Sequence, residues 1–296
     1  MTNNNQITGI MWMLLHCLLI SIMSVMIVVM SEKFHIFQIV FFHNFVAFLF
    51  TMPFVIKTGL VANLKTKKLP LHCLRAVLCV VSLAMYFYAI TIIPLTQARA
   101  IALSAPLIST LLAIFFLKEK TNFHKSIALC IGFIGSIVIL QPESVEFSYA
   151  ILLVVGAVCM WSAIDMIMKI LSSDATETQI FYLTAIMSLL SLPGAIYYWQ
   201  TPENYSDWLW LCAIGVIFLV NVLALFNAFR YADVTTIMPF DFTGMVFTAI
   251  IAYFAFDEIV KLEVFLGAAV IVLSSIYIVR KESIKDKHVP QLIVPE

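Results

Sequence analysis

The stretch DVTTIMPFDFTGMVFTAIIAYFAFDE, residues 233–258, decides the fold, because it is an apolar run long enough to cross a bilayer and has a charged residue, Asp241, inside it. Pro239 lacks a backbone donor and Gly244 weakens the turn that follows, so we expect the helix to bend beside Asp241. Ionisable side chains at this depth mostly face a cavity or pair with a neighbouring helix. We predict that Asp241 lines a central cavity, where it holds a positive group or carries a proton; the alternative is that it only fixes the packing.

The composition of the whole chain is typical of a membrane protein. Of its 296 residues, 62% are hydrophobic and 11% are charged, and the mean hydropathy is +1.03. The formal net charge is zero, which gives no support for a nucleic-acid partner. The six cysteines form no CxxC pair and have no metal-ligand spacing to a histidine. We therefore expect no metal and no other cofactor.

Hydropathy divides the chain into ten apolar spans of about 20 residues each. They cover residues 9–30, 35–56, 71–91, 94–117, 123–140, 149–170, 178–199, 207–230, 234–256 and 262–279. Lysine and arginine gather after spans two, four and ten, so the positive-inside rule predicts that both termini are cytoplasmic. The tail, residues 281–296, contains charges and two prolines and is expected to be disordered.

The two halves of the chain correspond to each other at a constant offset, which pairs Glu119 with Glu258. Five spans in each half require the second half to enter the membrane from the opposite side. The charges agree, because the lysine-rich connection after span two corresponds to an acidic connection after span seven. We predict an all-α fold of ten transmembrane helices, built as two inverted five-helix halves, residues 1–140 and 149–280, with the substrate site between them.

These features resemble the drug/metabolite transporter superfamily, EamA type, over nearly the whole chain. Each half has an apolar run that ends on a glutamate, AIFFLKE at residues 113–119 and AYFAFDE at residues 252–258, before a helix with spaced small residues. The resemblance implies a multi-pass transporter of the bacterial inner membrane that works by alternating access.

A narrower part of the sequence is similar to the S-adenosylmethionine uptake transporters of intracellular bacteria. The similarity rests on Phe181-Tyr182, Ser191-Leu192-Pro193, Tyr198-Trp199 and Thr201-Pro202. It implies that S-adenosylmethionine or an amino-acid-like solute is the substrate.

Polar and aromatic side chains within the spans are the candidate substrate-binding residues. They are Asp241, His43, Asn44, Arg99, Asn221, Trp161, Phe240, Phe242 and Tyr182. The aromatic rings could stack on a planar or cationic substrate. His43 could carry a proton or be a packing residue, and Arg99 could attract a carboxylate or pair with Asp241.

Three more charged residues lie near the ends of spans. Asp165 and Lys169 are four residues apart in the order that favours a helical ion pair, so they are expected to form such a pair or a gate. For Lys169 the alternative is a side chain that only anchors the helix at the membrane boundary. Arg75 lies at a cytoplasmic end and is expected to act mainly on topology.

No motif of a known enzyme class is present: the chain has no HExxH, GxSxG, Walker A or GxGxxG pattern. We therefore expect a secondary transporter whose partners are the lipid bilayer and a small-molecule solute, which is exchanged or coupled to protons. The alternatives are a membrane-embedded enzyme that uses Asp241 and His43 as acid and base, and an ion channel.

Overall fold

The computed structural model describes residues 3–57, 66–89, 92–93, 98, 101–140, 148–256 and 262–287. The predicted site residue Arg99 lies outside these ranges. All elements in the described part of the chain are helices. They are α1 (Asn3–Ser31), α2 (Ile36–Lys57), α4 (Leu69–Ala89), α6 (Ala105–Phe116), α7 (Phe123–Leu140), α8 (Tyr149–Leu171), α9 (Thr176–Tyr197), α10 (Tyr205–Tyr231), α11 (Val234–Asp241), α12 (Thr243–Phe256) and α13 (Leu262–Lys287).

The helix bounds differ most from the predicted spans at the start of α6 and at the end of α13. Helix α6 begins at Ala105, later than the predicted start of its span, and has Pro106 in its first turn, where a proline needs no intrahelical partner. Helix α13 continues through residues 281–287, which we expected to belong to a disordered tail. Residues 288–296 lie outside the described part of the chain.

Seven helical segments are long and apolar enough to cross a membrane, as judged from their length and composition over the described residues. They are Asn5–Ser31, Ile36–Lys57, Leu69–Tyr86, Tyr149–Leu171, Thr176–Tyr197, Tyr205–Tyr231 and Val234–Ala255. Three of the predicted spans contain shorter apolar helices, which are Ala105–Phe116, Phe123–Val138 and Phe265–Ile278. The chain is thus a multi-pass helical membrane protein, and the count of ten spans stays a prediction.

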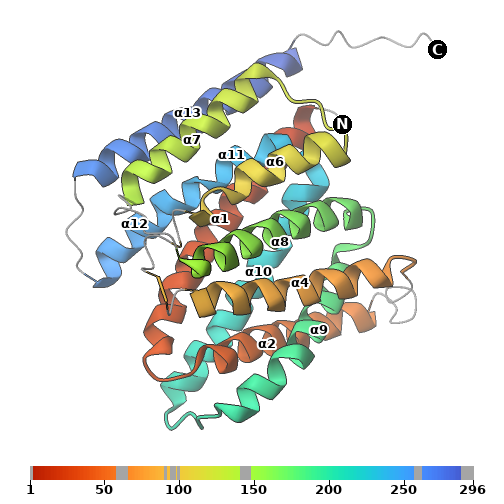
Figure 1. Ribbon diagram of the computed structural model, residues 1–296. Coiled ribbons are helices and arrows are strands. Elements are labelled where there is room, and N and C mark those ends of the chain that lie inside the picture. The colour runs from red at the N-terminus through yellow and green to blue at the C-terminus, as the bar shows by residue number, and fades with distance from the viewer. Residues whose placement is uncertain are drawn as a thin grey trace.

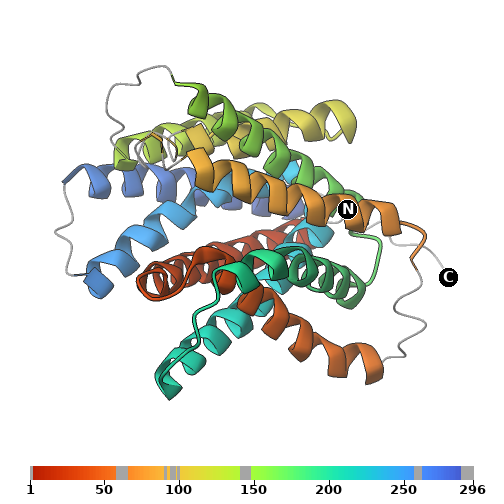
Figure 2. The same cartoon turned by 60° about the horizontal axis from the view of Figure 1, so that its bottom comes forward.

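The helices pack as one bundle in which the two ends of the chain are interleaved (Figure 1). Helices α7 and α13 lie side by side at one edge, and α2 and α9 pack together at the other, in both views (Figures 1 and 2). Helix α1 runs between them and packs against α10, α11 and α12. Gly9 permits this approach, because a Cβ atom there would lie 2.3 Å from the Ala232 Cβ.

The helix of residues 233–258 breaks where its sequence predicts. Helix α11 ends at Asp241, Phe242 forms the turn, and α12 begins at Thr243. Pro239 lies within α11 and removes one backbone donor just before the break. The Thr243 hydroxyl donates to the Phe240 carbonyl oxygen over 2.6 Å, and so provides a partner for a carbonyl group at the break.

Candidate functional site

Helix α1 covers the break at Asp241 and supplies it with hydrogen-bond donors. The Cys17 sulfur lies 3.5 Å from the Phe240 carbonyl oxygen and 3.9 Å from that of Asp241. The Ser21 hydroxyl donates to the Gly244 carbonyl oxygen over 3.0 Å. A broken helix leaves carbonyl groups that membrane lipid cannot satisfy, so these contacts stabilise the bend. The Asp241 carboxylate itself is only partly buried and accepts no hydrogen bond from the described residues.

The two phenylalanines beside Asp241 are fully buried and have different neighbours. The Phe242 ring fills space left by Gly132 on α7, where a Cβ atom would lie 2.6 Å from the ring, and its centroid is 6.4 Å from that of Phe133. Phe240 borders an apolar groove of about 410 Å³ between α1, α12 and α13. At least Phe242 is thus engaged in packing against α7.

A second carboxylate, Asp165 on α8, lies in the same interior region of the bundle as Asp241. The Ser109 hydroxyl of α6 donates to Asp165 Oδ2 over 2.6 Å. Asp165 lies within electrostatic range of Asp241, and Cys79 of α4 lies within range of Asp165. Asp165, like Asp241, is surrounded by protein yet keeps part of its surface accessible. Two carboxylates thus share the interior of the bundle.

Asp165 and Lys169 do not form the ion pair that their spacing predicts. The Lys169 ammonium donates to the Phe229 carbonyl oxygen over 2.9 Å and to that of Ala232, and lies 3.9 Å from Asp233 Oδ1. These carbonyls belong to the last turn of α10 and its cap, which lack intrahelical donors and attract a cation. Lys169 therefore binds the end of α10, and the Ser109 hydroxyl is the hydrogen-bond donor to Asp165.

Polar contacts tie α1 and the segment after α6 to the junction between α10 and α11. The Gln6 amide donates to Asp233 Oδ2 over 2.8 Å, and the Asp233 backbone N–H donates back to Gln6 Oε1 over 3.1 Å. Both oxygens of Glu119 accept backbone N–H groups at the start of α11, from Val234 over 3.0 Å and from Thr235 over 2.9 Å. We call Gln6, Glu119, Lys169 and Asp233 the junction cluster.

A second set of contacts closes the opposite end of α10. The Lys33 ammonium lies 2.9 Å from Asp207 Oδ1, and the Gln38 side chain forms two hydrogen bonds with the backbone of Gln200. These residues connect α2 and the segment before it to the first turn of α10 and the segment before that helix. A polar pocket of about 580 Å³ lies here, lined by Lys33, Phe34, Gln200, Thr201, Glu203, Asn204 and Asp207.

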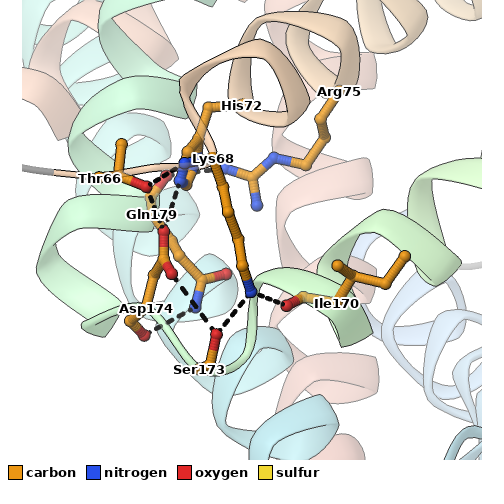
Figure 3. Close-up of polar contacts among 8 residues, drawn as sticks. All are labelled: Thr66, Lys68, His72, Arg75, Ile170, Ser173, Asp174 and Gln179. Atoms are coloured by element: carbon orange, nitrogen blue, oxygen red, sulfur yellow. Dashed lines mark hydrogen bonds and ion pairs between the residues drawn. The ribbon is translucent and has the colours of Figure 1, made fainter.

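The loop between α8 and α9 is bound to the start of α4 through Asp174 (Figure 3). The Thr66 hydroxyl donates to Asp174 Oδ2 over 2.7 Å, and His72 Nε2 lies 3.1 Å from the same oxygen. Partial burial raises the pKa of the Asp174 carboxyl, but the hydrogen bonds from Thr66 and His72 and the charge of Lys68 outweigh it, so that the pKa lies below its usual value. Lys68 also donates to the Ile170 carbonyl oxygen over 2.7 Å.

Arg75 of α4 lies beside this contact and is buried, unlike a side chain that acts only on topology. Its exposed fraction is 1%. Nη2 donates to the Gln179 carbonyl oxygen over 2.8 Å, and the guanidinium carbon lies 4.8 Å from the Phe226 ring centroid. Nε and Nη1 have no hydrogen-bond partner among the described residues. Arg75 therefore also packs inside the bundle, and its topological role stays a prediction.

The polar residues predicted on α2 and α10 are buried. The His43 ring lies 4.3 Å from the Phe218 ring between centroids. Asn44 donates to the Val40 carbonyl oxygen of its own helix over 2.9 Å, while its side-chain oxygen lacks a partner among the described residues. The Asn221 side-chain oxygen likewise lacks one there. His43 thus lies at the α2–α10 interface, whereas Asn221 of α10 is a neighbour of His16 on α1. No contact in the described chain joins His43 to Asp241.

The two remaining predicted aromatic residues lie on different helices. The Trp161 ring centroid is 5.3 Å from that of Tyr86, at the α4–α8 interface. The Tyr182 ring is 5.1 Å from His72, next to the Asp174 contact. No group of three potential metal ligands occurs among the described residues.

Sequence reasoning assigned no role to Glu119 and too small a role to Arg75. The repeat marks Glu119 together with its counterpart Glu258, because both end the same apolar run, but its partner at the start of α11 is not visible in the sequence. No sequence signal separates a buried Arg75 from an arginine that extends to the membrane surface.

Comparison with known proteins agrees with these observations. The model of the EamA-like transporter family matches the chain twice, over residues 7–141 and 148–280. The chain is 31% identical over 288 residues to a protein named S-adenosylmethionine uptake transporter from Rickettsia prowazekii, covering 96% of this chain and 97% of that protein. It is 30% identical over 245 residues to a protein named riboflavin transporter from Vibrio cholerae, covering 82% of each.

A solved crystal structure shares the fold, with a TM-score of 0.77 and 15% sequence identity. The match covers 97% of this chain and 100% of the chain in that structure. The likeness to this structure concerns the fold alone. The two matches to the family model together span most of the chain and show its family. This chain belongs to the EamA-like transporter family.

Proposed function

We propose that this transporter has ten membrane spans, arranged as two inverted halves of residues 1–140 and 149–280, with both termini in the cytoplasm of a bacterium and the protein in its inner membrane. The two successive matches to one family model, each over about half of the chain, support the repeat. Membership of a transporter family favours transport over the alternative of an enzyme that uses Asp241 and His43 as acid and base.

The substrate that we propose is S-adenosylmethionine, with other amino-acid-like solutes as alternatives. The observation that carries this proposal is the presence of two carboxylates, Asp165 and Asp241, inside the bundle and within electrostatic range, Asp241 lying at the break between α11 and α12. S-adenosylmethionine brings a sulfonium and an ammonium cation, which two carboxylates could stabilise at low cost in a site of low polarity. Riboflavin has no ionised group at neutral pH and would leave both carboxylates unpaired.

Asp165 and Asp241 are the proposed cation-binding residues, and Asp241 is also the residue that could carry a coupling proton. The side chains that we propose to line the rest of the path are His43, Asn44, Arg99, Asn221, Trp161, Tyr182, Phe240 and Phe242. Aromatic rings among them offer faces to the adenine ring and to the sulfonium.

Alternating access requires that the two ends of the path open in turn. We propose the junction cluster as the gate at one end and the Lys33–Asp207 contact as the gate at the other. Both are polar contacts between helices far apart in the sequence, which can separate without unfolding a helix. Lys169 takes the role of a gate residue in this arrangement.

Uptake into sealed vesicles that contain only purified protein and lipid tests the proposed function. We expect accumulation of unmodified labelled S-adenosylmethionine, and competition by unlabelled S-adenosylmethionine but not by an anionic nucleotide sugar. Uptake of riboflavin but not of S-adenosylmethionine would contradict the proposed substrate. Conversion of the solute without accumulation would favour the enzyme, and flux far above carrier rates without counterflow would favour a channel.

A further inference from the structure

Arg75 contains buried donors that the described chain does not use. A guanidinium has five N–H groups, and the structure gives Arg75 one hydrogen bond, to the Gln179 carbonyl oxygen. Its Nε and Nη1 atoms are buried without a partner, and so is the side-chain oxygen Oε1 of Gln179. A buried charge without a counter-charge is costly, which makes an unpaired arginine at membrane depth a candidate for binding an anionic group.

The helices that carry the interior charges, α4, α8 and α11, each have one end on the same side of the bundle. The start of α4 is joined to the end of α8, because Lys68 donates to the Ile170 carbonyl oxygen over 2.7 Å. The end of α8 is joined to the start of α11, because the Lys169 ammonium lies 3.9 Å from Asp233 Oδ1. Depth along these three helices can therefore be counted from a common end.

Arg75, Asp165 and Asp241 lie at a similar depth from that end. Each is about two helical turns away from the corresponding terminus of α4, α8 or α11, which amounts to about 10 Å. The guanidinium leaves α4 toward α9 and α10, where it contacts Gln179 and Phe226, and so points into the bundle. Cys79 lies one turn further along α4, within electrostatic range of both Arg75 and Asp165.

We propose that Arg75 binds the carboxylate of the transported solute, while Asp165 and Asp241 bind its cationic groups. This inference rests on the proposed function, since it says which residue of the same central site binds which charged group of the solute. One guanidinium and two carboxylates complement a solute with one carboxylate and two cations, which is the charge set of S-adenosylmethionine. The unpaired Gln179 oxygen beside Arg75 adds an acceptor for the ammonium that neighbours an amino-acid carboxylate.

A purely structural Arg75 would hold α4 against α9 and α10 through Gln179 and Phe226. The two roles differ in what they do to selectivity. Loss of a packing contact weakens every ligand alike, whereas loss of a carboxylate-binding group weakens only ligands that have the carboxylate. The ratio of two affinities therefore separates the roles even where a variant lowers stability.

The experiment measures binding to the purified full-length protein by titration calorimetry, with S-adenosylmethionine and its decarboxylated analogue as probes. We expect the wild type to bind S-adenosylmethionine roughly tenfold to hundredfold more tightly, as a charge-assisted buried hydrogen bond implies. In Arg75→Gln the affinity for S-adenosylmethionine should fall while the affinity for the decarboxylated analogue stays the same, so that the two become similar. Arg230→Gln, which removes an exposed arginine at the end of α10, should keep the wild-type ratio.

Each outcome decides between the proposals. Equal affinities in the wild type, or an unchanged ratio in Arg75→Gln, would overturn the role of Arg75 and leave transport untouched. If Arg75→Gln does not fold, the ratio in the wild type and in Arg75→Lys, which keeps the charge without the planar fork, decides the question. Failure of the wild type to bind or transport S-adenosylmethionine or methionine would contradict the proposed function itself, and the role of Arg75 with it.

Discussion

At the scale of single residues, Asp241 is the side chain whose replacement says most about transport. Asp241→Asn keeps the shape but removes the charge, so we expect S-adenosylmethionine binding to weaken by about 1.5–3 kcal/mol, or roughly tenfold to a hundredfold, in a folded protein. If Asp241 carries a proton instead, concentrative uptake should stop while exchange of labelled for unlabelled solute continues. Binding by calorimetry and both transport modes in vesicles measure this.

The control for this change is Glu32→Gln, which removes an exposed carboxylate from the segment between α1 and α2. It should leave affinity, uptake and exchange as they are. Normal values of all three in Asp241→Asn would show that Asp241 only fixes the packing.

Asp174 predicts a pH dependence of stability outside the membrane spans. Its pKa is lowered by Thr66, His72 and Lys68 against the effect of partial burial, so its ionised form stabilises the fold above the ordinary aspartate pKa, and this contribution is lost as the pH falls through the lowered value. Asp174→Asn should reduce the melting temperature in detergent by roughly 2–4 °C at neutral pH, for a loss of about 1 kcal/mol. The difference from wild type should shrink in acid; a difference that is constant with pH would contradict this account.

Single residues also show which contacts could be predicted from the sequence and which could not. Asp241 was found because a carboxylate in an apolar run is rare, and the break beside it because Pro239 lacks a donor. The partners of Lys169 and Arg75 come from α9 and α10, more than 50 residues away, and only packing brings them together. Spacing within one helix therefore predicted an Asp165–Lys169 pair, whereas in the structure both residues bind partners distant in the sequence.

At the scale of helices, the break between α11 and α12 depends on the space that Gly132 leaves for Phe242. Gly132→Val would place a Cβ atom 2.6 Å from the Phe242 ring in a packed interior, so we expect a loss of about 1–3 kcal/mol and a shift of the break that lowers uptake. Thermal stability and vesicle uptake check this. Gly244→Ala is the matched control, because its Cβ atom would meet only the Cys17 Cβ at 3.9 Å. An equal effect of both changes would show that the glycine positions do not act through Phe242.

The helices themselves were predictable, since hydropathy marks apolar runs and proline marks the bend, whereas the contacts between helices were not. Glu119 shows the difference. The repeat singled it out as a glutamate that closes an apolar run, but only the fold places both of its oxygens on the backbone N–H groups at the start of α11. A capping role requires the position of the capped helix, which no local pattern provides.

At the scale of the whole molecule, the ends of the helices predict the topology. The contacts of Lys68 with Ile170, of Lys169 with Asp233 and of Glu119 with α11 place the ends of α4, α6, α8, α10 and α11 on one side. The basic residues that follow the second and fourth predicted spans lie in the connections next to these ends, so the positive-inside rule assigns this side to the cytoplasm. An odd number of spans between any two of these ends would place them on opposite sides.

Reporter fusions test this assignment directly. A reporter after Glu296, or inserted within residues 57–70 or 118–125, should report a cytoplasmic position, and one within residues 141–148 should report an external position. The reason is parity, since ten spans return the chain to the side on which it began. The insertion at 141–148 is the internal control, because it follows five spans and must differ from the other three whatever the orientation. An external C-terminus together with a cytoplasmic 57–70 connection would require an odd number of spans after that connection and would refute both the count of ten and the inverted halves.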